Sequence, residues 1–209
     1  MAMNDFDLIA RYYDGMKKLV FGHHLTIASR YFLAEIPTGS KALLIGGGSG
    51  EDLEVLEAIN VDFVEKSKQM LTLAQDRYTM ATVQFIHVDF LDWATDTQYD
   101  YIICPFFLDV FDEEDLIAAI AKLRSLLTSK GSLIVTDFQQ PNTVRQKGLL
   151  WVMHRFFRVF ASLQSRKLQP IRDQLAGQGF SEVQCTTFAQ GFVFTCRMRQ
   201  NRQSRPDGG

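Results

Sequence analysis

The sequence predicts an α/β protein with a doubly wound, mostly parallel seven-stranded sheet, a Rossmann-like arrangement that ends in an antiparallel hairpin. The first observation is an alternation of strand and helix patterns, with strands expected at 41–46, 61–65, 83–88, 99–104 and 131–138 and helices at 51–59, 67–79 and 112–128. The second is that runs such as 101–104 and 133–135 are continuously apolar, which is typical of parallel strands buried on both faces. The third is a tight connection around Gln190-Gly191 between apolar runs 180–188 and 191–199, which predicts the closing hairpin.

Size and pattern predict one domain over residues 1–200. The chain has 209 residues, which is a usual size for one domain. Within it we expect an N-terminal helical cap at 1–38 and a helical lid insertion at 139–166, while the polar segment 201–209 is expected to be a disordered tail.

Composition and charge favour a soluble, cytoplasmic protein. The net charge of −2 argues against a nucleic-acid binder. The three cysteines are odd in number and show no metal-type pairing, so we expect reduced thiols and no metal site. The first residues lack the pattern of a signal peptide, and no apolar run reaches the roughly 20 residues of a membrane span.

A glycine cluster, Gly46 to Gly50, follows the first strand directly. The dinucleotide spacing G-x-G-x-x-G fails in both registers and no P-loop lysine follows, whereas G-x-G-x-G matches. Glu51 and Asp52 occupy the first turn after the loop, where a pyrophosphate would prefer no carboxylate. The pattern favours a phosphate-free ligand with an ammonium group, such as S-adenosylmethionine, although the two acids are also suited to complementing a helix dipole.

These residues, together with Val61–Ser67, Phe85–Phe90 and Tyr99–Pro105, resemble the motifs of the class I S-adenosylmethionine-dependent methyltransferases. The resemblance covers residues 40–138 and implies a set of cofactor contacts. They are Gly46, Gly47 and Gly48 at the methionine end, Glu65 on both ribose hydroxyls, Lys66 and Phe90 beside the adenine, Asp89 on the adenine amino group, and Pro105 near the transferred methyl.

Two positions depart from the family pattern. Leu44 stands where the family commonly has an acid, so either cofactor binding is weaker or another acid such as Glu51 or Asp109 replaces it. The segment Cys104–Phe107 lacks the Asn/Asp-Pro-Pro-Tyr/Phe signature of enzymes that methylate amino groups of adenine or glutamine. A non-catalytic S-adenosylmethionine-binding or interaction module therefore stays as the alternative to an enzyme.

The acceptor side is less defined by the sequence. Methyl transfer from a sulfonium depends mostly on alignment, so a general base is needed only when the acceptor must lose a proton. The candidates are Tyr13, Asp109 and His154.

The segment 143–161 combines aromatic and basic residues without an acid. As a roof over the acceptor it implies a small apolar or amphiphilic molecule. The alternatives are packing against the sheet, contact with a membrane or lipid, and a homodimer interface, with nucleic acid ranked below these.

Overall fold

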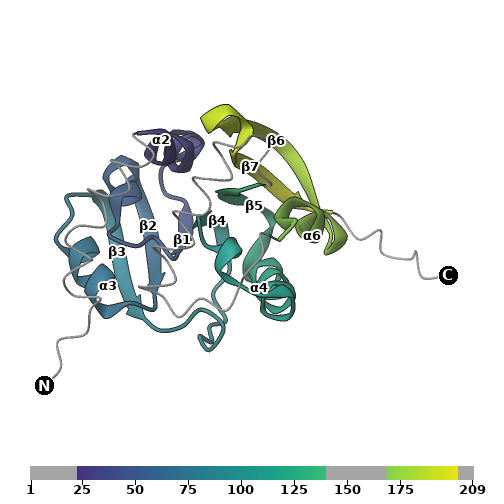
Figure 1. Cartoon of the computed structure of the whole chain (residues 1–209). Helices are drawn as coiled ribbons and strands as arrows, with labels where there is room; N and C mark the ends of the chain where they lie inside the picture. The colour runs from purple at the N-terminus through teal and green to yellow at the C-terminus, as the bar shows by residue number, and fades with distance from the viewer. Residues whose placement is uncertain (1–22, 140–168, 202–209) are drawn as a thin grey trace, which may run out of the picture.

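The computed structural model describes residues 23–139 and 169–201. The seven strands within these two ranges belong to one sheet with the order β3-β2-β1-β4-β5-β7-β6 (Figure 1). In chain order the strands are β1 (Lys41–Ile45), β2 (Glu57–Glu65), β3 (Met80–His87), β4 (Tyr99–Pro105), β5 (Leu127–Phe138), β6 (Phe180–Phe188) and β7 (Val193–Gln200). The strand pairs from β3 to β5 are parallel, and β7 is antiparallel to both β5 and β6, which confirms the predicted fold class.

Helices cover both faces of the sheet. They are α2 (His24–Arg30), α3 (Lys68–Gln75), α4 (Glu113–Leu126) and α6 (Ile171–Gly177), with short 3₁₀ turns that include η2 (Glu51–Val55) and η3 (Leu108–Val110). Two N-caps explain where the central helices begin: the Ser67 side chain accepts from the amide of Met70, and the Asp112 side chain accepts from the amide of Asp115.

The strand order reverses between β1 and β4, because β1 connects outward to β2 whereas β4 continues in the opposite direction to β5. In open α/β sheets the crevice outside the carboxyl ends of the strands at such a switch point is where ligands bind. The segments that follow β1, β2, β3 and β4 are therefore the ones that position a site.

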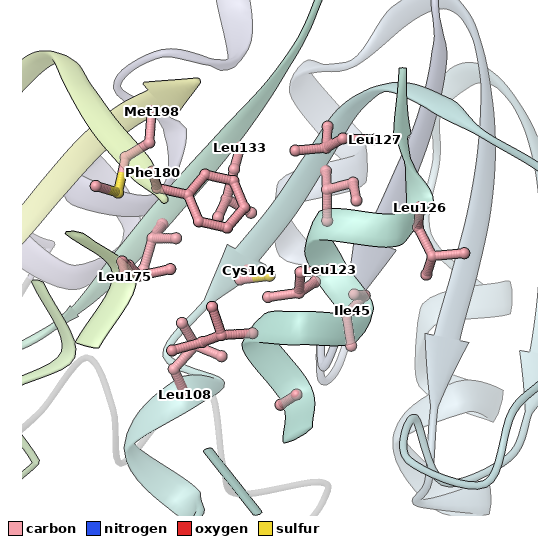
Figure 2. Close-up of a cluster of buried hydrophobic side chains, with 14 of the residues drawn as sticks. Ile45, Cys104, Leu108, Leu123, Leu126, Leu127, Leu133, Leu175, Phe180 and Met198 are labelled. Atoms are coloured by element: carbon pink, nitrogen blue, oxygen red, sulfur yellow. The ribbon is translucent and has the colours of Figure 1, made fainter. Parts of the chain in front are cut away.

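The continuously apolar strands are buried on both faces, as expected. In β1, Leu43 and Ile45 pack in a cluster with α4 and α6, whereas Leu44 packs in a second cluster with η2 and α3. Figure 2 shows the first cluster, in which Leu123 of α4 and Leu175 of α6 meet the strand residues. The sheet is thus held rigid from both sides, so its carboxyl edge has a fixed geometry.

The predicted helix at 51–59 is wrong. The chain forms the 3₁₀ turn η2 over Glu51–Val55 and is already in β2 at Glu57. Leu53, Leu56 and Ile59 are all buried, but only Leu53 lies in the 3₁₀ turn, because Leu56 is already extended and Ile59 belongs to β2.

The cysteines also differ from the expectation of reduced thiols. Cys185 and Cys196 form a disulfide between β6 and β7, and Cys104 is free and buried. The hairpin register places Cys185 directly opposite Cys196, a pairing that their separation in the sequence does not reveal. Within the two described ranges, no helix combines the length and the apolar character of a membrane span.

Candidate cofactor and active site

The glycine loop after β1 turns sharply at the switch point. The Gly46 amide donates to the Val64 carbonyl at 3.0 Å, which ties the loop to β2. Gly46 and Gly48 have φ values of +63° and +56°, a region that favours glycine. An added Cβ on Gly47 would lie 2.1 Å from Leu44 Cδ2, whereas one on Gly48 would have no described atom within 4 Å. The backbone at Gly48 therefore faces open space that a ligand can approach.

Glu65, at the end of β2, lies beside this loop. Its Oε2 accepts from the Gly48 amide at 3.2 Å and its Oε1 from the Ser67 amide at 2.8 Å. Burial raises the pKa of Glu65 above its ordinary value, although the amides of Ser67 and Gly48 oppose the shift. The structure thus brings together two of the predicted cofactor contacts, the glycine loop and the second-strand acid.

Lys66 and Asp89 meet across the ends of β2 and β3. Lys66 Nζ lies 2.7 Å from Asp89 Oδ2, and the Leu91 amide donates to Asp89 Oδ1 at 3.0 Å. Burial pulls the pKa of Asp89 upward, but the hydrogen bonds from Lys66 and Leu91 hold it below its ordinary value. Asp89 is therefore an ionised acceptor at the edge of the site.

The next residue, Phe90, is buried and only 3% exposed. Its ring packs edge-on against Phe107, with the ring centroids 5.7 Å apart. An added Cβ on Gly46 would lie 2.6 Å from Phe107 Cδ2, so this ring also borders the glycine loop.

The end of β4 has a backbone feature that the sequence did not predict. Pro105 is buried, and Phe106 has a φ of +53°, which is costly for a side chain of this size. The Phe106 amide donates to the Thr136 carbonyl at 2.6 Å, and its ring lies 5.0 Å from Phe138. Such strain is commonly found at functional sites, and here it directs an aromatic ring to the end of β4.

Two carboxylates lie near the carboxyl ends of β4 and β5: Asp109 is in η3, and Asp137 is within β5. Asp137, which is 0% exposed, accepts from the amides of Leu108 and Asp109 through Oδ2 at 3.0 and 3.2 Å, and from the amide of Phe138 through Oδ1 at 2.8 Å. Burial raises the pKa of Asp109 to about 7, and burial together with the charge of Asp109 raises the pKa of Asp137. Sequence reasoning named Asp109 but missed Asp137, whose signal is an acid at the end of a long apolar strand.

The two acids that follow the glycine loop contact α2. Asp52 accepts from Ser29 Oγ at 2.7 Å, and Glu51 Oε2 accepts from Thr26 Oγ1 at 3.3 Å. Both acids are buried, with exposures of 6% and 5% for Glu51 and Asp52. Leu44, where the family commonly has an acid, is 0% exposed in the core beneath the loop. These acids therefore link the glycine loop to α2.

Some predicted residues lie outside the described residues, namely Tyr13, His154 and the segment 143–161. Among the residues that the structure describes, the cluster with metal-ligand spacing is Glu182, Cys185 and Cys196, and its two sulfurs form the disulfide.

Comparison with known proteins gives a match to a protein family and a likeness in fold. Residues 42–131 match the family model described as a methyltransferase domain. Comparison with curated protein sequences finds no match.

Three of the similar solved structures illustrate the likeness. An S-adenosylmethionine-dependent methyltransferase from Clostridium acetobutylicum is 10% identical with a TM-score of 0.67, over 93% of this chain and 99% of that one. The 1,6-didemethyltoxoflavin-N1-methyltransferase of Burkholderia thailandensis, with bound 1,6-didemethyltoxoflavin and S-adenosylhomocysteine, is 15% identical with a TM-score of 0.66, over 93% of this chain and 86% of that one.

The mitomycin 7-O-methyltransferase MmcR is 15% identical with a TM-score of 0.59, and the match covers 91% of this chain but only 57% of that one. Residues 42–131 thus match a methyltransferase domain, and the chain shares the fold of the solved methyltransferases to which it is similar.

Proposed function

We propose that this protein binds S-adenosylmethionine and transfers its methyl group to a small apolar or amphiphilic acceptor. The observation that carries the proposal is the meeting of Gly48, Glu65 and Asp89 at the ends of three adjacent parallel strands, with Glu65 hydrogen-bonded to the Gly48 amide. This arrangement offers a backbone turn open to a ligand and two carboxylates that can accept hydrogen bonds from it.

The residues present match the cofactor in their chemistry. The backbone of the glycine loop would hold the methionine end, Glu65 would accept from the ribose hydroxyls, and Asp89 would accept from the adenine amino group. When bound, the sulfonium supplies an activated methyl group, so the protein's main contribution is alignment of the acceptor.

The acceptor side is proposed to lie beyond β4 and β5. The rings of Phe106, Phe138 and Phe192 follow one another there, with centroids 5.0 and 5.2 Å apart. Asp109 is the proposed general base, because burial raises its pKa to about 7 and a base is most effective near the working pH. MmcR is a 7-O-methyltransferase of mitomycin and the Burkholderia enzyme is an N1-methyltransferase of a toxoflavin precursor, so a small acceptor has precedent on this fold.

A methyl-transfer assay tests the proposal. The full chain is incubated with methyl-labelled S-adenosylmethionine and a panel of small aromatic and amphiphilic compounds that carry an ionisable hydroxyl or N–H group. We expect label in one acceptor class, and a rate reduced by about 100-fold in Asp109→Asn at unchanged cofactor affinity. Cofactor binding without transfer to any member would favour the non-catalytic binding module instead.

A further inference from the structure

Lys122 lies on α4, and its ammonium group contacts the turn at residues 90–93, after β3. Nζ donates to the carbonyls of Phe90 at 2.6 Å, of Leu91 at 3.0 Å and of Trp93. A lysine ammonium has three donors, so each of its hydrogens has a backbone acceptor. The same Nζ lies 5.0 Å from the centroid of the Phe90 ring, within cation–π range.

This turn is the one that orients Asp89. The peptide group between Phe90 and Leu91 gives its carbonyl to Lys122 and its N–H to Asp89 Oδ1. The peptide unit is planar, so the position of Lys122 fixes the direction of the N–H that holds the carboxylate. The amides of Asp92 and Trp93 also donate to the Asp89 carbonyl, at 3.1 and 3.0 Å, which closes the turn.

Lys66 holds the other oxygen of Asp89, Oδ2, at 2.7 Å, so Lys122 acts on the Oδ1 side of the carboxylate. Residues 88–98 connect β3 to β4 without an α-helix, so the turn is not held by helical hydrogen bonds along its length. Three carbonyls that converge on one point would repel one another if the cation were removed, and each would lose its Nζ donor, although the Phe90 carbonyl would keep the Trp93 amide at 3.3 Å. We expect the turn to relax in that case and the Asp89 carboxylate to lose its fixed direction.

We propose that Lys122 is a positioning residue for the adenine end of the cofactor site, and that it sets the preference for a purine with a 6-amino group through the 90–91 peptide and Asp89. This inference rests on the proposed function, because it takes Asp89 as the acceptor of the adenine amino group. A 6-oxo purine would present an oxygen to that carboxylate in place of a donor, so a well-oriented Asp89 rejects it.

The test compares the affinities of S-adenosylhomocysteine and S-inosylhomocysteine, which differ at purine position 6. Calorimetry on the full chain is expected to give a preference of at least about tenfold for the adenosyl compound. Lys122→Met keeps the length of the side chain and removes the charge, and we expect the ratio of the two affinities to fall towards one. Lys130→Met, at an exposed lysine on β5, is the matched control and should keep the ratio of the parent protein.

A role limited to stability would weaken both ligands equally and leave the ratio unchanged. Folded Lys122→Met with the parent ratio would therefore overturn the inference. If that variant does not fold, Lys122→Arg decides, because a planar guanidinium cannot match three converging carbonyls and should still lower the ratio. In an Asp89→Asn background, Lys122→Met should have no further effect on the ratio.

The proposed function is tested separately by the parent protein. If the parent does not bind S-adenosylhomocysteine, both the proposed function and this inference are overturned. If it binds with a preference that Lys122→Met does not alter, only the inference is overturned.

Discussion

Replacement of Glu65 by glutamine should weaken S-adenosylmethionine binding with little change in the fold. The carboxylate accepts from the amides of Gly48 and Ser67, and the proposal adds the ribose hydroxyls as donors. A glutamine side chain has only one oxygen, so its amide nitrogen must face at least one of these donors. Loss of one hydrogen bond to a charged acceptor costs about 1.5–3 kcal/mol, which corresponds to a dissociation constant about 10- to 150-fold higher.

The pH dependence of binding adds a second measure for the same residue. Burial raises the pKa of Glu65, and the ionised form is the one that accepts from hydroxyls. Affinity should therefore fall as the pH drops through this raised pKa, while the affinity of Glu65→Gln stays flat over the same range. Equilibrium dialysis with labelled cofactor between pH 4 and 8 measures both effects.

The matched control is Glu57→Gln, at an exposed glutamate at the other end of β2, which should bind as the parent does. A change of less than about threefold for Glu65→Gln, or a parent protein whose affinity does not depend on pH, would refute the assignment of Glu65 to the ribose.

Three further results are expected. Gly47→Ala should lower the free energy of unfolding by about 1–3 kcal/mol through overpacking, measured as a lower melting temperature. Gly48→Ala should cost about 1 kcal/mol through backbone strain yet abolish cofactor binding. Asp109→Asn should be more stable than the parent at pH 8 by at least about 1 kcal/mol, as urea titration can show. The raised pKa of Asp109 means that its favourable contribution to stability is fully present below about pH 4 and is lost as the pH rises through about 7. Reduction of the Cys185–Cys196 disulfide, with a sequence separation of 11, should cost about 3 kcal/mol in calorimetric unfolding; an unchanged unfolding temperature would contradict it.

Much of the fold could be predicted because its signal is local. Runs such as 101–104 are apolar without alternation, and burial on both faces is the physical reason, which the clusters around β4 and β1 confirm. The hairpin was likewise predicted from a turn signal around Gln190-Gly191. The prediction of a helix at 51–59 was wrong, because apolar residues at every third position are compatible with one α-helical face over so short a segment.

The site could be predicted only in part. Glycines and acids at strand ends are visible in the sequence, and parallel strands bring those ends together. Contacts that depend on three-dimensional packing left no local signal: Lys122 reaches a turn about 30 residues earlier, and Asp137 binds the amides of Leu108 and Asp109. The same holds for Cys185 and Cys196, whose pairing depends on the register of β6 and β7.

Calorimetric titration of the parent protein with S-adenosylmethionine tests the central claim most directly. The account predicts saturable binding of one cofactor per chain, with a dissociation constant of roughly 1–100 μM. It also predicts no competition from NAD, because the glycine loop lacks the G-x-G-x-x-G spacing of dinucleotide-binding loops. The absence of saturable binding up to about 1 mM, or displacement of the cofactor by NAD, would contradict it.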